Sequence, residues 1–498
     1  MARSIADAIA QNTSLDTIRT FNRLSSQATK VLAIEHVIDL YPRLQSNVTR
    51  HKCLLTVARL LEELASTAPL DHHATFLSFA RRFLELDLTS QLLDALSALS
   101  LWDLAAYLSS NLRIEAARHL RTAILELCPP PESGLAVSRH DPSSFRNASI
   151  RILAPARFDL GMGGMSDIPP YSLERYGNCV NAPIRLNRYF PLEATARILD
   201  EPVLQFVSKS SGETRVYRDI SEFDEQPKPL LFHREVFRFL VNEILDLDSA
   251  KEVYNLLHGG VHLETYSHLP LGTGLGMSSL LFCALLKALG GVLGITFSSQ
   301  TLFVTSVYLE NVTGIGGGWE DATAIYPGVK LMESFPDSPL SPQCTRLSLS
   351  EQRVRDMQKH LILVYTGLPK QSQAFFASMV ERYCLGDTNT LVAIERNNAL
   401  NKELSELLVV GDLADIGKTI RAQWENWKVL TEGNCSTPEV DHLFAQVEPY
   451  VYGARMNGAG QGGCATLMAR EGKKEKLANV IRSVLGDSAV FYRWEPIL

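Results

Sequence analysis

The sequence lacks the cysteine patterns of a zinc site or a redox pair. Its eight cysteines are dispersed over 498 residues, and no two of them are separated by two residues. This spacing excludes a zinc ribbon or a CxxC redox motif. Dispersed cysteines in a long chain are typical of a reduced, intracellular protein.

The sequence also lacks a secretory leader, an unbroken apolar run and an excess of positive charge. The first residues include Asp7 and Asp16 and no apolar core, so we expect no signal peptide and a cytoplasmic protein. The most apolar stretch, 269–294, is broken by glycines and Lys287, which favours a buried helix over a membrane span. With 48 basic and 55 acidic residues, the chain gives no indication of a nucleic-acid partner.

The pattern of side chains changes along the chain. Residues 1–128 place apolar side chains at helical spacing with charges between them, which predicts an all-α N-terminal region. Residues 129–148 are rich in proline and serine and indicate a linker. From residue 149 onward, strand-like runs mix with helices and glycine-rich loops, which predicts an α+β part.

Residues 270–279 predict a phosphate-binding loop. Alternating glycines precede two serines and a long apolar helix, and glycines let a backbone approach an anion closely. The start of a helix offers free N–H groups and the positive end of its dipole, while Ser278 or Ser279 could ligate Mg²⁺. The loop has neither the lysine of a P-loop nor the GxGxxG spacing of a dinucleotide site. A glycine turn that only packs a helix on a strand is the alternative.

A second glycine loop, 314–318, lies between two carboxylates, Glu310 and Asp321. Flexible glycines let both converge on one small volume. A Mg²⁺–ATP site needs that arrangement, with one carboxylate for the metal and one near the acceptor hydroxyl. Glu320 adjoins Asp321, although adjacent side chains usually diverge. The alternative is an acidic surface loop, which four glycines and Trp319 in so few positions disfavour.

A third segment, 157–177, surrounds a double-glycine turn with ionisable side chains. Carboxylates accept hydrogen bonds well and suit the hydroxyl groups of a sugar. Arg157 could neutralise a transferring phosphate or lower the pKa of a neighbouring aspartate. A structural ion pair of Arg157 with Asp159 or Glu174 is the alternative.

Together and in this order, the three segments resemble the GHMP kinase superfamily. LPLGTGLGMSS resembles its phosphate loop and NGAGQGGCATLM its C-terminal glycine motif, while Glu310 and Asp321 match a metal-ligand Glu and a catalytic Asp. Within the superfamily, GMGGMSDIPPYSLERYG and GGGWEDATAIYPGVKL resemble the fucokinase branch. Met165, Glu320 and Ala322 depart from that branch, which has Trp at the first position and Gln at the other two.

The resemblance covers residues 149–498 and implies two α+β lobes. The N-terminal lobe, 149–350, would resemble domain 2 of ribosomal protein S5, and the C-terminal lobe, 351–498, would be ferredoxin-like. The implied activity is that of an ATP- and Mg²⁺-dependent sugar kinase which converts L-fucose to L-fucose 1-phosphate, on a salvage route to GDP-fucose.

The resemblance also implies roles for single residues. Asp321 would be catalytic, Arg157 would assist it, and Ser278 and Glu310 would hold Mg²⁺. The residues implied to hold ATP are Gly272, Gly274, Gly276, Met277, Ser278, Ser279, Gly458 and Gly460. The residues implied to face the sugar are Asp167, Glu174, Gly164, Gly317 and Gly318.

Several alternatives stay open from the sequence. The chain could phosphorylate another sugar, such as a heptose 7-phosphate, with Arg175 or Arg185 as the extra basic contact, or it could be a non-catalytic sugar sensor. The helical region could contact another protein or connect to an upstream pyrophosphorylase module, of which 1–148 has no signature. The expected partner is a small-molecule sugar, with neither nucleic acid nor membrane.

Two further groups of residues have simpler interpretations. His258, His262 and His268 lie on or beside a predicted strand and complete no metal pattern, so a structural role is expected. Trp424 and Trp427 are three residues apart on a predicted helix, which favours a place in the core.

Overall fold

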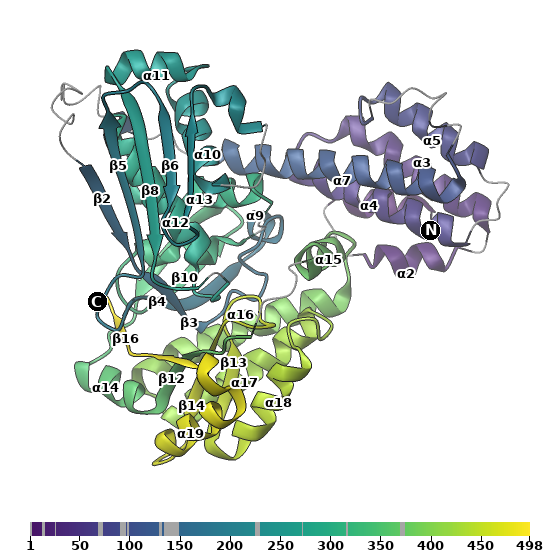
Figure 1. Ribbon diagram of the computed structural model, residues 1–498. Coiled ribbons are helices and arrows are strands. Elements are labelled where there is room, and N and C mark those ends of the chain that lie inside the picture. Colours follow the sequence, from purple (N-terminus) through teal and green to yellow (C-terminus); the bar gives the residue numbers. More distant parts are fainter. Residues whose placement is uncertain are drawn as a thin grey trace. The chain divides into compact units, whose positions relative to one another are not determined.

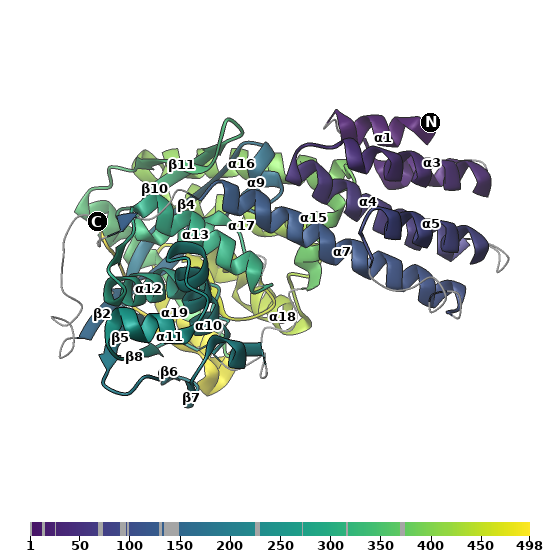
Figure 2. The same cartoon turned by 90° about the horizontal axis from the view of Figure 1, so that it is seen from above.

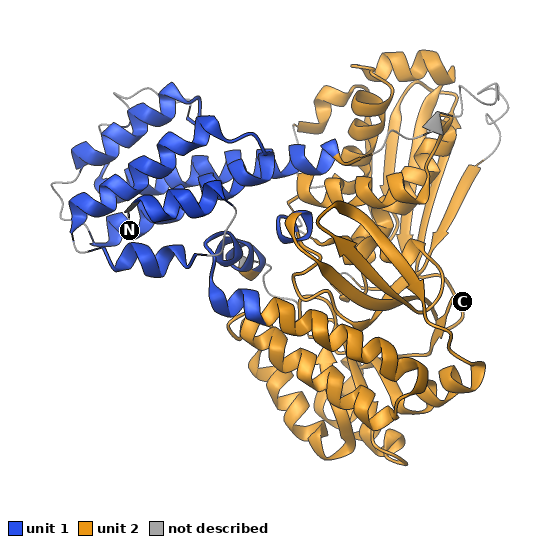
Figure 3. Cartoon of the chain, turned by 180° about the vertical axis from the view of Figure 1, so that it is seen from behind, with its two compact units in different colours: residues 1–126, 169–173, 376–392 blue, residues 127–168, 174–375, 393–498 orange. Residues whose placement is uncertain are grey.

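The computed structural model consists of two compact units. It describes residues 2–11, 15–24, 26–67, 73–89, 96, 99–128, 132–133, 149–224, 230–270, 272–314, 317–368 and 374–498. The helical unit comprises Met1–Glu126, Pro169–Leu173 and Phe376–Val392, and the remaining residues form the α+β unit (Figure 3). Two short segments from the later sequence therefore belong with the N-terminal helices.

The helical unit is built from amphipathic helices that lie side by side (Figure 2). Its N-terminal helices are α1 (Ala2–Ala10), α2 (Thr17–Asn22), α3 (Gln27–Leu40), α4 (Asn47–Thr67), α5 (His73–Glu85) and α7 (Leu101–Glu126). The other elements that contribute to it are α9 (Tyr171–Glu174), α15 (Ala374–Cys384) and the start of α16 (Thr388–Val410). On α7, Leu104, Leu108 and Leu112 recur every four residues and are fully buried, as expected of a helix with one apolar face. The prediction of a helical N-terminal region is confirmed.

Only part of the predicted linker can be compared with the structure. Within 129–148 the described residues form one short strand, β1 (Glu132–Ser133), which pairs antiparallel with β9 (Ile295–Thr296). The remainder of that prediction lies outside the described residues.

The first sheet of the α+β unit has five strands in the order β2-β5-β8-β6-β7 (Figure 1). The strands are β2 (Ser149–Ala154), β5 (Leu192–Leu199), β6 (Leu204–Ser208), β7 (Glu213–Tyr217) and β8 (Gly260–Ser267). Only β6 and β8 pair in parallel within this sheet, and the other neighbours are antiparallel. The helices of this lobe are α10 (Leu231–Arg238), α11 (Ala250–Leu257), α12 (Met277–Val292) and α13 (Ser299–Val312). The long helix α12 packs against β2 and β5.

A second sheet carries two charged residues of the candidate site, Arg157 and Asp159. Its order is β11-β10-β4-β16, with β3 also paired to β4. The strands are β3 (Ala156–Gly161), β4 (Gly177–Leu186), β10 (Lys330–Phe335), β11 (Ser338–Arg346) and β16 (Trp494–Pro496). Every residue of β3 is buried, so its charged residues Arg157 and Asp159 need partners within the protein.

The C-terminal lobe has a four-stranded antiparallel sheet in the order β13-β14-β12-β15. The strands are β12 (Leu361–Tyr365), β13 (Val451–Met456), β14 (Cys464–Ala469) and β15 (Val490–Tyr492). The helices are α14 (Glu351–His360), α16, α17 (Leu413–Leu430), α18 (Pro438–Val447) and α19 (Lys474–Leu485). One apolar core joins Phe158 and Ile184 of the second sheet to Leu404 and Ile420 of this lobe. The predicted α+β fold with two lobes is confirmed.

The apolar stretch 269–294 ends in helix α12, most of whose residues are buried. Within the described part of the chain, no helix is both long enough and apolar enough to cross a membrane.

Candidate active site

Arg157, on the buried strand β3, lies at the centre of the site. Its Nε is 2.6 Å from Oδ1 of Asp159, and its Nη2 donates to Oδ2 of Asp159 over 2.7 Å. Its Nη1 donates to Oδ1 of Asp321. Burial alone would lower the pKa of Arg157, but the charges of Asp159 and Asp321 outweigh burial and raise this pKa well above its usual value. Arg157 is therefore charged and held in place by two carboxylates.

Asp321 differs from Asp159 in its access to solvent. It lies in the first turn of a 3₁₀ helix, Trp319–Ile325, and its side chain is 29% exposed, against 1% for Asp159. The structural ion pair of Arg157 with Asp159 is confirmed. The same guanidinium group also binds the more exposed Asp321, and its role toward a phosphate stays a prediction.

Glu310, near the end of α13, faces the same small space as Asp321. Its Oε1 accepts a hydrogen bond of 2.5 Å from Ser279, at the start of α12. A Cβ atom placed on Gly317 would overlap Oε2 of Glu310 and would lie 3.3 Å from Oδ2 of Asp321. A side chain at position 317 would displace the carboxylate of Glu310, so a glycine here lets the two carboxylates meet.

The surroundings of Glu310 fit a divalent cation. Its Oε2 is buried without a hydrogen-bond partner among the described residues. Burial raises the pKa of Glu310 well above its usual value, and the charge of Asp321 adds to this rise, while the hydrogen bond from Ser279 opposes it. A bound cation would stabilise the ionised carboxylate. Of the two serines, it is Ser279 that bonds Glu310, whereas Ser278 is half-buried at the helix start.

In the described ranges no group of three or more His, Cys, Asp or Glu side chains is arranged to hold a metal ion by itself.

The phosphate-loop residues lie against the C-terminal glycine segment. At Gly274, with φ +73°, a Cβ would overlap the carbonyl oxygen of Asn457. A Cβ on Gly458 would lie 2.9 Å from Cα of Gly274, and the N–H of Cys464 donates to the carbonyl of Thr273 over 2.9 Å. The other residues predicted to hold ATP lie nearby. Gly272 precedes Thr273 and Gly274, which contact the C-terminal glycine segment, and Gly460 of that segment lies against Cys435. Gly276 is the N-cap of α12, and Met277 is its first residue.

Asp167 lies between two glycine backbones. A Cβ on Gly163 or on Gly318 would overlap its carboxylate, and its carbonyl accepts from the N–H of Trp319 over 3.0 Å. Burial raises the pKa of Asp167 to about 7, with the charge of Asp321 adding to the rise. Gly164 precedes it with φ +57°, while Glu174 ends the short helix α9 and is half-buried.

Glu320 belongs to the site although its side chain diverges from that of Asp321, as expected of adjacent residues. Its Oε2 accepts from the N–H of Gly163 over 2.6 Å, and its side chain is buried. Burial, with the charge of Asp159, raises the pKa of Glu320 well above its usual value. In a 3₁₀ helix successive side chains are 120° apart, so Glu320 faces the protein interior while Asp321 reaches solvent.

A buried polar network that the sequence did not indicate supports the double-glycine turn. Asn397 and Asn401 of α16 both donate to the carbonyl of Met162, over 2.7 and 2.8 Å. Gln423 donates to Asn401 over 2.7 Å, and Arg455 donates to Gln423 over 2.9 Å. The four-residue spacing of the two asparagines is the one signal in the sequence, because it places both on one face of a helix.

The simpler interpretations are confirmed for His262 and for the two tryptophans. His262 is hydrogen-bonded to Gln205 over 2.9 Å, and Trp424 and Trp427 are buried. Trp319 is fully buried, so it anchors the loop from inside.

Family profiles match both lobes. Residues 240–328 match the GHMP kinases N terminal domain, and residues 402–487 match the GHMP kinases C terminal domain.

Curated relatives and a solved structure agree with these profiles. A bifunctional fucokinase/GDP-fucose pyrophosphorylase from Arabidopsis thaliana is 28% identical over 71% of this chain and 33% of its own. This chain thus spans about a third of the length of that relative. A D-glycero-alpha-D-manno-heptose 7-phosphate kinase from Campylobacter jejuni is 22% identical over 68% of this chain and 94% of its own. The structure of Lactococcus lactis galactokinase superposes with a TM-score of 0.55 and 19% identity, over 73% of this chain and 98% of its own.

Proposed function

Because this chain belongs to the GHMP kinases, whose N-terminal and C-terminal domains it carries, we propose that it transfers the terminal phosphoryl group of ATP to a sugar. The proposed sugar is L-fucose, and the proposed product is L-fucose 1-phosphate. The observation that supports this most is the meeting of Glu310 and Asp321 beside Gly317, with Arg157 bound to Asp321.

Asp321 is the proposed catalytic carboxylate. Its exposure lets it contact a bound hydroxyl group, and Nη1 of Arg157 donates to its Oδ1. It would accept a hydrogen bond from the acceptor hydroxyl, orient that oxygen toward the phosphoryl group and take up its proton as the new P–O bond forms. Arg157 would also stabilise negative charge that develops during transfer, because its guanidinium is fixed before the substrate arrives.

ATP and Mg²⁺ would be held by residues at the start of α12 and the end of α13. Glu310, and the hydroxyl of Ser278, are the proposed metal ligands, and the unpartnered Oε2 of Glu310 supports the first of these. The backbone of 272–279 would face the phosphates, at the positive end of the α12 dipole. When bound, the metal neutralises phosphate charge.

Asp167 is the proposed sugar ligand whose protonation matters most. Its pKa of about 7 means that it can exist as an acid or as a carboxylate near neutral pH. It could therefore donate to a sugar hydroxyl or accept from one. Glu174, Gly164, Gly317 and Gly318 complete the proposed sugar contacts.

The second candidate is a heptose 7-phosphate kinase activity. The match to the Campylobacter jejuni heptose 7-phosphate kinase favours it, because that match covers 94% of the relative's length. That substrate needs a cation for its phosphate. Arg185 is exposed on β4, and its guanidinium group lies over the ring of Phe190 at 4.9 Å. Arg175 directly follows Glu174, a proposed sugar ligand.

The Arabidopsis relative carries a second activity in its name, that of a pyrophosphorylase. We propose that the sugar 1-phosphate made here is likewise passed to such an enzyme. We further propose that the reaction takes place in the cytoplasm.

The test is ADP release from Mg²⁺–ATP with a panel of sugars, followed by ³¹P NMR of the product. L-Fucose as the best acceptor, with a phosphate ester at the anomeric oxygen, is the expected result. Preference for a heptose 7-phosphate would replace the first candidate by the second. No turnover on any sugar by a folded protein that binds ATP would contradict both and would favour a sugar sensor.

A further inference from the structure

Two short segments of the later chain belong to the helical unit. Pro169–Leu173 and Phe376–Val392 are separated by about two hundred residues in the sequence, yet both are grouped with the N-terminal helices (Figure 3). The contacts of Glu381 and Tyr383 within this unit show how the helices hold both segments.

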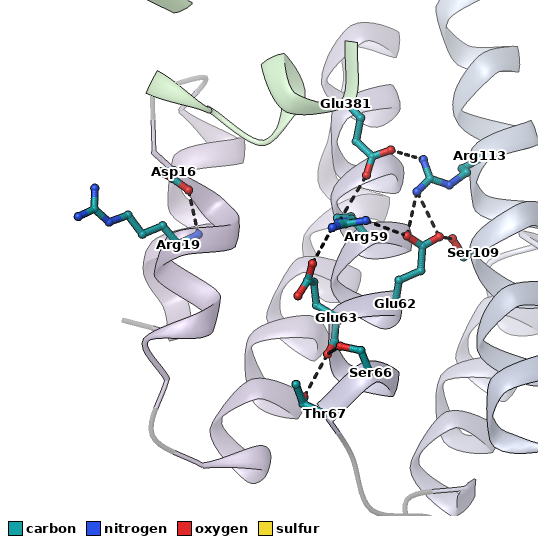
Figure 4. Close-up of polar contacts among 10 residues, drawn as sticks. All are labelled: Asp16, Arg19, Arg59, Glu62, Glu63, Ser66, Thr67, Ser109, Arg113 and Glu381. Atoms are coloured by element: carbon teal, nitrogen blue, oxygen red, sulfur yellow. Dashed lines mark hydrogen bonds and ion pairs between the residues drawn. The ribbon is translucent and has the colours of Figure 1, made fainter. Parts of the chain in front are cut away.

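Glu381 of α15 is bound by arginines from two N-terminal helices (Figure 4). Its Oε2 lies 2.5 Å from Nη1 of Arg113 on α7, and its Oε1 lies 3.8 Å from Nε of Arg59 on α4. Glu62 contacts the same two arginines, at 3.2 Å and 3.5 Å, and accepts from Ser109 over 2.5 Å. The Glu381 side chain is only 15% exposed. Arg59 also pairs with Glu63 at 2.7 Å, so two arginines are shared by three carboxylates. A network of this kind constrains geometry more than an isolated surface ion pair does.

Tyr383 joins the two late segments to each other. Its ring lies 5.2 Å from the ring of Tyr171, edge to face, and both tyrosines are buried. The ammonium group of Lys52, on α4, lies 4.9 Å from the centre of the Tyr383 ring. Just beyond, the carbonyl of Leu385 accepts from the N–H of Thr17 over 2.8 Å.

Each of these segments continues directly into residues that shape the proposed sugar site. Pro169–Leu173 lies between Asp167 and Glu174 in the chain, and Tyr171 begins the helix that ends at Glu174. Helix α16 begins at Thr388 within the helical unit and continues to Asn397, which donates to the carbonyls of Met162 and Gly163. A helix transmits a constraint along its length because its backbone is hydrogen-bonded throughout.

We propose that the helical unit positions the sugar-binding loop. Through Glu381 and Tyr383 it fixes the segment between Asp167 and Glu174 and the start of α16. Glu381, Tyr383 and Tyr171 are positioning residues, because they act through the loop. This inference rests on the proposed sugar site, and it gives the N-terminal helices a role in the reaction itself.

The kinetic test uses Glu381→Ala in the full chain with L-fucose as the acceptor. Loosening the loop lowers the fraction of protein that is ready to bind sugar, which raises the apparent KM in proportion. We expect the KM for L-fucose to rise about tenfold while kcat and the KM for ATP change less than about twofold. Arg118→Ala is the matched control, since it removes an ion pair with Glu115 on the same helix α7 without touching Glu381.

Two more variants separate positioning from general damage. Arg113→Ala combined with Glu381→Ala should raise the KM by less than the product of the two single effects, because both variants remove the Arg113–Glu381 ion pair. Tyr383→Leu, which deletes the ring contact with Tyr171, should raise the KM for L-fucose in the same selective way. The proposal would be overturned if these variants changed the KM for L-fucose and the KM for ATP equally. It would also be overturned if the KM for L-fucose stayed unchanged in Glu381→Ala and Tyr383→Leu.

Amide hydrogen exchange tests the coupling without turnover. In Glu381→Ala, amides of residues 171–176 and 388–397 should exchange about tenfold faster than in the wild type or in Arg118→Ala, because local opening becomes easier. Unchanged exchange in both segments would overturn the proposal. Absence of turnover by the wild-type protein would instead contradict the proposed function, so the two failures are distinguishable.

Discussion

Replacing Asp167 by Asn should remove part of the pH dependence of stability of the α+β unit. Burial and the charge of Asp321 raise the pKa of Asp167 from 3.8 to about 7 in the folded protein. Between these two pH values the folded state holds a proton that the unfolded chain has lost, so stability falls as the pH rises through about 7. One group with these two pKa values contributes about 2 kcal/mol more stability at about pH 5.5 than at about pH 8.

Urea unfolding followed by tryptophan fluorescence measures this difference. Trp319, Trp424, Trp427 and Trp494 belong to the α+β unit and Trp102 to the helical unit, so the signal reports mainly on the former. Burial raises the pKa values of Glu310 and Glu320 as well, with the charge of Asp167 among the smaller causes. Most of their contribution to the pH dependence of stability therefore persists in the variant. The quantity to compare at the two pH values is therefore the difference in the free energy of unfolding between the wild type and Asp167→Asn.

The expected result is that Asp167→Asn gains stability relative to the wild type as the pH rises from about 5.5 to about 8, by about 2 kcal/mol. Asp337→Asn, at an exposed position between β10 and β11, is the control and should follow the wild type. If Asp167→Asn keeps the full pH dependence of the wild type, the carboxyl of Asp167 is ionised in the folded protein and the reasoning is refuted.

Three further substitutions test the geometry. Gly317→Ala should abolish Mg²⁺-dependent ADP release while the thermal transition is kept, because a Cβ would occupy the space beside Glu310; retained turnover would contradict this. Gly274→Ala should weaken ATP binding about tenfold or more in calorimetry, since φ is +73° and a Cβ would overlap the Asn457 carbonyl; unchanged affinity would count against the phosphate loop. Arg455→Met should destabilise the α+β unit by about 3 kcal/mol in urea, because two buried acceptors lose their donor; a neutral result would show that the network relaxes.

The local patterns of the sequence predicted much of the fold. Helix α12 and its glycine loop were predictable because the loop, the helix start and the apolar run are contiguous in the sequence. The meeting of Glu310 and Asp321 was predictable for the same reason, since only a short glycine loop separates them. These features depend on neighbours along the chain, which is the information that a sequence pattern contains.

Other features depend on contacts between distant segments or on small rotations. Whether Ser278 or Ser279 faces Glu310 depends on how α12 is rotated about its axis. Adjacent residues of a helix point in different directions, and the sequence pattern does not determine this rotation. Glu320 was left out because its burial depends on the 3₁₀ turn. Membership of Phe376–Val392 in the helical unit follows from contacts made by side chains such as Glu381, whose partners lie more than two hundred residues earlier.

The most direct test of the central claim compares Asp321→Asn with the wild type. ATP binding is measured by calorimetry, and ADP release is measured with Mg²⁺–ATP and L-fucose. The account predicts that the variant binds ATP as the wild type does and loses turnover by a factor of about a hundred or more, because the acceptor hydroxyl loses the group that orients it and takes its proton. Turnover within a few-fold of the wild type would contradict the assignment of Asp321 and the account built on it.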